Sequence, residues 1–170
     1  MLYIFLLILI VILGTFAYGG ISGAPYVPMR KNDVSSFLDL ADIKSGDKFI
    51  DIGCGDGRLL FTVARSGAIA TGYEISLIPY AISKLKLLFL KEKNNVTIHY
   101  ANFWNKNLRD ADIIYFFLTP KFYPKIAKKL KEELRPGTKV LSYIWPIAGW
   151  EIASQVKTFN KNNLYLYIIK

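Results

Sequence analysis

This sequence is short of cysteine and histidine, and its first part carries no charge. Its 170 residues include one cysteine, Cys54, and one histidine, which excludes an intramolecular disulfide and a structural Cys/His zinc site. Charged residues make up 21% and hydrophobic residues 52%, which excludes a disordered or collagen-like chain. No Asp, Glu, Lys or Arg occurs before Arg30, although the net charge is +9. The sequence therefore predicts an apolar leader followed by one basic domain.

The leader is long enough to serve as a membrane anchor. Residues 1–13 are unbroken Leu, Ile, Val, Phe, Tyr and Met. Roughly 20 helical residues at about 1.5 Å each cross one hydrocarbon layer. We expect a single-pass transmembrane anchor over residues 1–21 and a Pro/Gly-rich linker over 22–33. Arg30 and Lys31 follow, and the positive-inside rule places them and the domain in the cytoplasm.

Two other interpretations of the leader stay open. A cleaved signal peptide would use Ala17-Tyr18-Gly19 as its small-x-small site, but the positive n-region that such peptides carry is missing. A buried helix of the domain is the second. The uncleaved anchor is favoured because the ligand expected for the domain is cytosolic.

Strands and helices are predicted to alternate over residues 34–170. Short apolar runs indicate strands at 48–52, 68–73, 96–100, 112–118 and 138–143, and helical patterns lie at 34–41 (capped by Asn32 or Asp33), 58–66, after Ser76 and after Pro124. The tail is predicted to form a hairpin of 152–158 and 164–169. Alternating helices and near-continuous apolar strands predict a doubly wound, mostly parallel α/β sheet with both faces covered.

The predicted helix after Ser76 is amphipathic. One of its faces carries Ile78, Ala81, Ile82, Leu85 and Phe89. Many of the basic residues fall near it, at 84–93, and on the next long helix, at 121–131. A solvated outer face explains such lysines, and attraction to anionic lipid is the alternative beside an anchor. No RNA-binding module is recognisable, so nucleic acid is not expected as a partner.

The strongest functional signal is Asp51-Ile52-Gly53-Cys54-Gly55-Asp56-Gly57, between the first strand and its helix. Ligands of doubly wound sheets bind outside the carboxyl ends of the strands, where this loop lies. Its glycines allow sharp turns and a close approach to a ligand. The dinucleotide fingerprint would need another glycine where Arg58 stands. Acidic residues at 51 and 56 suit a ligand with an ammonium or sulfonium centre rather than phosphates.

Glu74 ends the second strand, where a carboxylate accepts both hydroxyls of a ribose. A glycine loop between a strand and a helix, with an acid at the end of the next strand, is more specific than either feature alone. A tight turn plus a solvated glutamate would explain neither spacing. The two features together therefore predict a nucleoside ligand with a cationic centre.

These residues resemble the first two motifs of class I S-adenosylmethionine-dependent methyltransferases. Further segments look like the ATP synthase c-subunit lysine methyltransferase family and its prokaryotic relatives: Ala24-Pro25-Tyr26-Val27-Pro28, Gly72-Tyr73-Glu74-Ile75, Asn102-Phe103-Trp104 and Glu133-Leu134-Arg135-Pro136-Gly137-Thr138. The similarity covers about residues 24–150. It implies a Rossmann-like fold of class I methyltransferase type, S-adenosyl-L-methionine as cofactor, a protein lysine as acceptor and a membrane-anchored enzyme.

The resemblance also implies roles for single residues. Asp51, Gly53 and Gly55 would hold the methionine portion of the cofactor, with Gly57 in the same loop, and Glu74 would hold the ribose. Asn102 stands where many relatives have an aspartate facing the adenine amino group. An asparagine carbonyl also accepts a hydrogen bond from that group.

The acceptor is expected at the end of the fourth predicted strand, Phe116-Phe117-Leu118-Thr119-Pro120. Backbone carbonyls near Thr119 and Pro120 would point the amine at the methyl group, and Tyr26, Phe117 and Trp145 would form apolar or cation–π walls. Core packing is the alternative role for these aromatic residues. No His–Asp or Cys–His pair occurs, so no general base is identified.

We therefore expect a membrane-bound protein-lysine N-methyltransferase with a cytoplasmic catalytic domain over residues 34–170. Methyl transfer to RNA or to a small molecule on the same fold is a second interpretation, because a fold does not fix the acceptor. A non-catalytic module that binds S-adenosylmethionine is a third. No metal is expected to take part.

Overall fold

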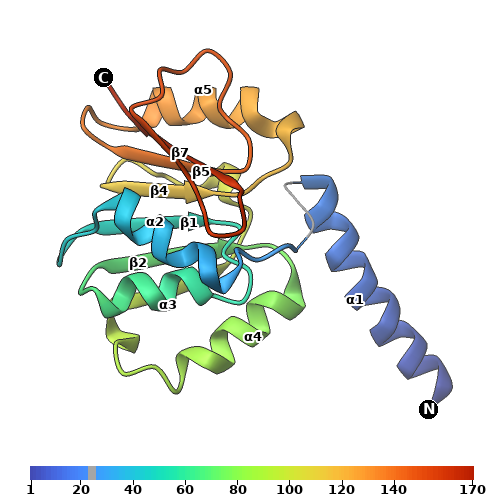
Figure 1. Cartoon of the computed structure of the whole chain (residues 1–170). Helices are drawn as coiled ribbons and strands as arrows, with labels where there is room; N and C mark the ends of the chain where they lie inside the picture. The colour runs from blue at the N-terminus through green and yellow to red at the C-terminus, as the bar shows by residue number, and fades with distance from the viewer. Residues whose placement is uncertain (23–25) are drawn as a thin grey trace.

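The structure, a computed structural model, describes residues 1–22 and 26–170. Its helices and strands alternate through the domain as predicted (Figure 1). The helices are α1 (Leu2–Ser22), α2 (Val34–Ala41), α3 (Arg58–Arg65), α4 (Leu77–Leu87) and α5 (Tyr123–Glu133). The strands are β1 (Lys48–Ile52), β2 (Ile69–Glu74), β3 (Val96–Tyr100), β4 (Ile113–Phe116), β5 (Lys139–Tyr143), β6 (Ser154–Lys157) and β7 (Asn163–Ile168). Short 3-10 helices are η1 (Lys31–Asp33), η2 (Lys93–Asn95), η3 (Phe103–Asn105) and η4 (Pro120–Phe122).

The strands form one seven-stranded sheet in the order β3-β2-β1-β4-β5-β7-β6. Neighbours from β3 to β5 pair in parallel, whereas β7 is antiparallel to both β5 and β6. The predicted doubly wound, mostly parallel sheet and the C-terminal hairpin are therefore confirmed. The strand order reverses between β1 and β4, and ligands of such sheets bind at that point, outside the carboxyl ends of the strands.

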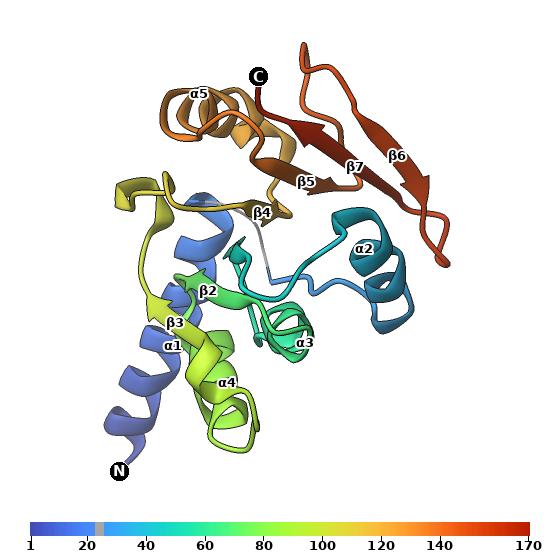
Figure 2. The same cartoon turned by 90° about the vertical axis from the view of Figure 1, so that its left-hand side faces the viewer.

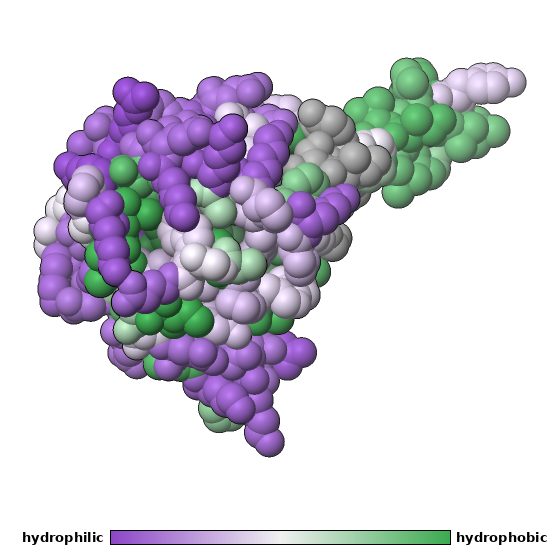
Figure 3. All heavy atoms as spheres, turned by 90° about the horizontal axis from the view of Figure 1, so that it is seen from above, coloured by the Kyte–Doolittle hydropathy of each residue, from purple (hydrophilic) through white to green (hydrophobic). Residues whose placement is uncertain are grey.

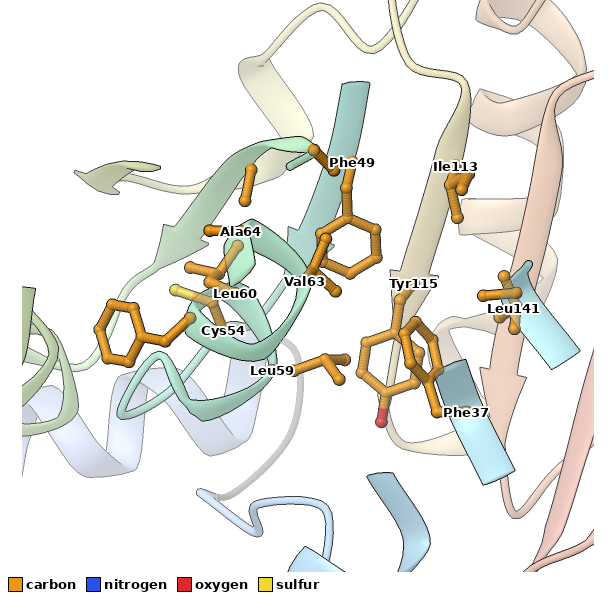
Figure 4. Packing of buried hydrophobic residues seen from close by; sticks show 14 of the residues in the cluster. Phe37, Phe49, Cys54, Leu59, Leu60, Val63, Ala64, Ile113, Tyr115 and Leu141 are labelled. Atoms are coloured by element: carbon orange, nitrogen blue, oxygen red, sulfur yellow. The ribbon is translucent and has the colours of Figure 1, made fainter. Parts of the chain in front are cut away.

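Helices cover both faces of the central strands, because these strands are apolar on both sides. Figure 2 shows α2 and α3 on one side of the sheet and α5 on the other. On the first side, the Phe37 ring lies edge-on to Phe49 at 5.9 Å and to Tyr115 at 5.3 Å (Figure 4). On the second side, Phe116 packs edge-on against Tyr123 of α5 at 5.3 Å. Two buried layers thus hold β1 and β4 in place.

The apolar face predicted for α4 exists, but it does not face the core. The residues that α4 buries are Pro79 and Ser83. Leu85 is 60% exposed, and Phe89, just beyond the helix, is 83% exposed. Ser76 occupies the N-cap position, yet its side chain makes no capping hydrogen bond.

Helix α1 precedes the domain and contacts it at α4. Figure 3 shows its side chains as an apolar arm that reaches out from a largely hydrophilic surface. Among the residues whose side chains the structure describes, no helix is long and apolar enough to cross a membrane. The transmembrane span predicted for residues 1–21 is therefore not supported by the structure.

Candidate functional site

A pocket opens at the carboxyl ends of β1, β2 and β4, beside the reversal in strand order. It holds about 830 Å³ of open space, its mouth included. Its walls come from residues 26–29, from the glycine loop at 53–56, from Glu74 to Ser76, from 101–103 and, at the end of β4, from Tyr115, Phe117 and Leu118. Segments far apart in the sequence thus meet where the topology places a ligand.

Six of the predicted site residues line this pocket and three do not. Tyr26, Asp51, Gly53, Gly55, Glu74 and Asn102 line it. Gly57 instead begins α3 with φ +77°, and a Cβ there would lie 2.6 Å from the Phe61 ring. Thr119 and Pro120 start η4, outside the pocket. The predicted Ala24 and Pro25 of the Pro-rich segment lie outside the described residues.

The glycine loop is tied to β2 and lies under Tyr26. The backbone N–H groups of Gly53 and Cys54 both donate to the carbonyl of Tyr73, at 2.9 and 3.1 Å. At Gly55 φ is +55°, and a Cβ there would lie 2.7 Å from the Tyr26 ring. Only glycine therefore allows both this backbone turn and the approach of the Tyr26 ring.

Glu74 is 7% exposed, and its carboxylate is held by backbone donors. Oε2 accepts from Gly55 N–H at 2.8 Å, and Oε1 accepts from Ile75 N–H at 2.9 Å and Ser76 N–H at 2.7 Å. A carboxylate offers about four acceptor positions, so about one is left. Accepting both hydroxyls of a ribose, as predicted, would therefore require the Gly55 N–H to give up its position.

Asp51 supplies a buried carboxylate with an unused oxygen. Its side chain is 2% exposed, and Oδ1 has no hydrogen-bond partner among the described residues. Burial raises the pKa of this carboxyl well above its usual range, and the nearby charges of Glu74 and Asp56 raise it further. A cation in the pocket would relieve both costs. The pocket therefore fits a positively charged ligand.

Asp56 does not add free negative charge to the pocket, contrary to the prediction. Arg58 donates to it from Nε at 3.0 Å and from a terminal nitrogen at 3.1 Å, and Lys86 Nζ lies 2.6 Å away. Burial alone would raise the pKa of Asp56, but hydrogen bonds from Arg58 and Lys86 lower it. Asp51, unlike Asp56, has no cationic partner among the described residues.

Asn102 lines the pocket and also starts η3. Its Oδ1 accepts a hydrogen bond from the backbone N–H of Trp104 at 3.1 Å. A carbonyl oxygen has a second acceptor position, so the predicted contact with an adenine amino group stays a prediction.

The wall at the end of β4 is aromatic. Phe117 lines the pocket, stacks on Trp145 at 5.6 Å and lies edge-on to Tyr143 at 5.1 Å. Trp145 is 38% exposed. The Thr119 carbonyl, predicted to orient an acceptor, accepts a hydrogen bond from Phe122 N–H at 3.0 Å, and its role toward an acceptor stays a prediction. Phe117 and Leu118 are the residues that reach the pocket from this segment.

A strained turn holds Trp145 beside Phe117. Ile144 has φ +73°, a left-handed conformation that β-branched residues rarely adopt. Its N–H donates to Asn163 O at 2.8 Å, and Ser142 Oγ donates to the Trp145 carbonyl at 2.9 Å. Strained residues of this kind concentrate at functional sites.

Arg58 and Tyr115 are pocket residues that sequence reasoning did not select. Besides pairing with Asp56, Arg58 donates to the Met29 carbonyl at 3.1 Å and so fastens residues 26–29 to the glycine loop. The sequence marks Arg58 in one way only: it stands where the dinucleotide fingerprint would need a glycine. Tyr115 stands beside Asp51 in the sheet register, and a tyrosine within an apolar strand gives no such signal.

Comparisons with known proteins agree with this geometry. Residues 51–154 match the family model described as the ANTKMT methyltransferase domain. A protein-lysine N-methyltransferase of Saccharolobus islandicus (strain REY15A) is 33% identical over 156 residues, which are 85% of this chain and 93% of that protein. A lysine N-methyltransferase of the ATP synthase c-subunit, from Xenopus laevis, is 27% identical over 74% of this chain, but the match spans only 55% of that protein.

A solved structure has the same fold over most of its length. It is an RNA methyltransferase from Salinibacter ruber in complex with S-adenosyl-L-homocysteine, with a TM-score of 0.80 and 27% identity. The match covers 84% of this chain and 94% of that one. The pocket described above therefore belongs to a fold that holds the demethylated form of this cofactor in a relative.

Proposed function

The chain belongs to the family of the ANTKMT methyltransferase domain, and from that premise we propose that it methylates lysine side chains of proteins. Its cofactor is S-adenosyl-L-methionine. The cofactor part of the proposal rests on the buried Asp51 carboxylate with its unused oxygen, next to the glycine loop and Glu74, and the lysine acceptor rests on the similarity to the protein-lysine N-methyltransferase of Saccharolobus islandicus. A cofactor with a cationic end and a ribose suits these groups.

When bound, the cofactor supplies an electrophilic methyl group on a sulfonium. Asp51 would place negative charge near the cationic end of the cofactor, and Glu74 would accept a hydroxyl hydrogen bond on its remaining acceptor position. Gly55 keeps the loop backbone close to the Tyr26 ring. Arg58 holds residues 26–29 against this loop and so limits the access of water.

The acceptor amine must lose its proton before it attacks. A lysine has an ordinary pKa of about 10.4, and an apolar, desolvated channel lowers that pKa. Phe117, Trp145 and Tyr26 supply such walls, and their rings also attract an ammonium group before it loses its proton. Burial raises the pKa of the Tyr26 phenol, and the charge of Asp56 adds to this, so Tyr26 stays protonated at neutral pH. Desolvation and orientation, rather than a general base, are the proposed source of catalysis.

Attachment to a membrane through α1, with the domain in the cytoplasm, is part of the same proposal. The leader carries no charge, and Leu7, Ile10 and Leu13 are 62%, 65% and 58% exposed. Moving exposed apolar side chains from water into a bilayer has a favourable free energy, which supports attachment through α1. Arg30 and Lys31 favour the cytoplasmic side. Carbonate washing of membranes tests attachment, because an integral protein stays in the membrane fraction. An intact mass that corresponds to a soluble chain beginning near Gly19 would contradict the proposal.

Methyl transfer to RNA is the alternative function, and a solved relative and the net charge support it. The solved relative from Salinibacter ruber is described as an RNA methyltransferase, and this chain has a net charge of +9. Basic domains bind nucleic acid through phosphate contacts.

One experiment separates the two acceptors. The full-length chain is incubated with radiolabelled cofactor and a membrane extract, and the products are treated with protease or with ribonuclease. We expect the label to be released by protease only and to lie on lysine by mass spectrometry. Label on RNA, lipid or a carboxyl ester, with none on lysine, would contradict the proposal. An Asp51→Asn chain serves as the matched negative control.

A further inference from the structure

An apolar stripe on α4 and its C-terminal turn is exposed to solvent. The stripe consists of Ile82, Leu85, Leu88 and Phe89, which are 39%, 60%, 67% and 83% exposed. Their spacing of three and four residues places them along one side of the helix. The helix is attached to the domain through Pro79 and Ser83 instead. Exposed apolar patches mark interaction surfaces, so we expect a binding partner to cover this stripe.

Helix α1 contacts α4 but does not cover this stripe. The two helices are in contact, and Figure 1 shows α1 near one end of α4 and then running away from the rest of that helix. The exposed fractions of the stripe are those that remain with α1 in place. Helix α1 also exposes apolar side chains, among them Leu7 and Ile10, so both helices present apolar surface to the surroundings.

Lysines flank the α4 apolar stripe. Lys84, Lys91 and Lys93 are exposed, and none of them forms an ion pair within residues 1–22 and 26–170. Lys86 differs, since its amino group is bound to Asp56. Leucine and phenylalanine on one side with free lysines around them is the composition of helices that lie in the surface of a bilayer. Lysine stems cover apolar surface while their amino groups reach anions.

We infer that the α4 apolar stripe lies in the headgroup layer of an anionic lipid bilayer. The inference rests on the proposed attachment of α1 and names a second, separate contact with the lipid. The free lysines decide between occupants: a second copy of this chain would bring the same positive charges together, whereas anionic phospholipid neutralises them.

This contact has a consequence for the pocket. Ile75 and Ser76 line the pocket, and α4 begins at the next residue. A helix seated in the headgroup layer therefore fixes the distance between the pocket and the lipid surface.

Spin labels on the full-length chain test the inference directly. Leu85→Cys and Phe89→Cys carry the label in the stripe, and Lys157→Cys on β6 is the matched exposed control. The native Cys54 is buried and stays unlabelled. In vesicles of phosphatidylcholine and phosphatidylglycerol we expect labels at 85 and 89 to collide more with oxygen and less with a water-soluble nickel chelate. The label at 157 should not change.

A charge comparison tests the lipid chemistry. Replacing Lys84, Lys91 and Lys93 by glutamine should weaken partitioning to phosphatidylglycerol vesicles by about fivefold per lysine. The control replaces Lys121, Lys125 and Lys128 of the η4–α5 region by glutamine, with the same change in net charge, and should have a smaller effect. On pure phosphatidylcholine the two triple variants should behave alike.

Each contrary result has its own meaning. If the chain floats with vesicles but the labels at 85 and 89 stay in water, the inference is wrong and the attachment of α1 stands. If the chain does not float, both are wrong, while the methyl-transfer assay is unaffected. Protection of the labels that appears without lipid and grows with protein concentration would show that a second copy covers the stripe, and would also overturn the inference.

Discussion

The carboxylate of Glu74 holds the glycine loop in shape, because its Oε2 accepts the backbone N–H of Gly55 at 2.8 Å. The same carboxylate is the group expected to bind the ribose of the cofactor. Loop shape and cofactor affinity therefore depend on one side chain, and a substitution there acts on both.

Glu74→Ala should weaken cofactor binding by roughly 10- to 150-fold, because charge-assisted hydrogen bonds worth about 1.5–3 kcal/mol are lost. Calorimetry with S-adenosyl-L-homocysteine measures this. Hydrogen exchange at the Gly55 amide should also become faster, since its acceptor is gone. Glu92→Ala, in a loop away from the pocket, is the control. Unchanged affinity in Glu74→Ala would contradict the ribose assignment.

Asp51→Asn should stabilise the free protein and weaken cofactor binding. Burial raises the pKa of Asp51, so the native state binds this proton more tightly than the unfolded state does. The contribution of Asp51 to the free energy of unfolding is therefore largest below about pH 3.9 and is lost as pH rises through the raised pKa. Asp51→Asn removes this decrease in the free energy of unfolding with rising pH. Thermal unfolding of the wild-type chain and the variant over a range of pH values measures the difference. Asp39→Asn, on the exposed side of α2, should leave the pH profile unchanged.

Binding of the cationic cofactor should also release a proton from Asp51 in the same pH range. Positive charge beside a carboxyl lowers its pKa, so affinity should rise with pH. Calorimetry in two buffers with different ionisation enthalpies measures the released proton. Equal binding enthalpies in both buffers would show that Asp51 does not change its charge.

Trp145→Ala should lower kcat and kcat/KM for the lysine acceptor together and leave cofactor affinity nearly unchanged. The Trp145 ring stacks on Phe117 beside the pocket and does not itself line the cofactor cavity. This kinetic pattern is the one expected when an interaction made only in the transition state is lost. Trp150→Ala, whose ring packs on Tyr167 away from the pocket, is the control. An equal decrease of kcat and kcat/KM in Trp145→Ala and Trp150→Ala would mean that the substitutions act by destabilising the fold, and would contradict the prediction.

Asp33→Asn should destabilise the fold at neutral pH by about 2 kcal/mol. Burial alone would raise the pKa of Asp33, but hydrogen bonds from Tyr143 and Asn160 outweigh it and lower the pKa to about 2. Each pKa unit is worth about 1.4 kcal/mol. This stability is present above the ordinary Asp pKa and is lost as pH falls from about 4 towards 2. Urea unfolding at pH 7 and pH 3 should show a smaller difference in the variant.

The order of elements and the glycine-loop site could be predicted because their signals are local. Apolar runs, the glycine trio and the acid after β2 each lie within a few residues of sequence, and the structure confirms the strands they mark. Asp51, Gly55 and Glu74 meet in one pocket because parallel strands align their carboxyl ends.

What could not be predicted depends on contacts distant in sequence. The pairing of Arg58 with the Met29 carbonyl spans 29 residues, and no pattern marks it. The apolar face of α4 has the usual helical period, and periodicity does not tell which way a face points. Asp33 stands at the predicted helix cap, yet its oxygens bind Tyr143, Asn160 and Asn162 instead.

That last contact sets an order of events during synthesis. Asp33 is the last residue of the linker, whereas Asn160 and Asn162 are in the final turn of the chain, so the ribosome must make nearly the whole protein before they can meet. The apolar leader emerges first and is free to find a bilayer while the domain is still incomplete. A nascent chain built in this way is therefore expected to reach a bilayer before the contacts of Asp33 can form.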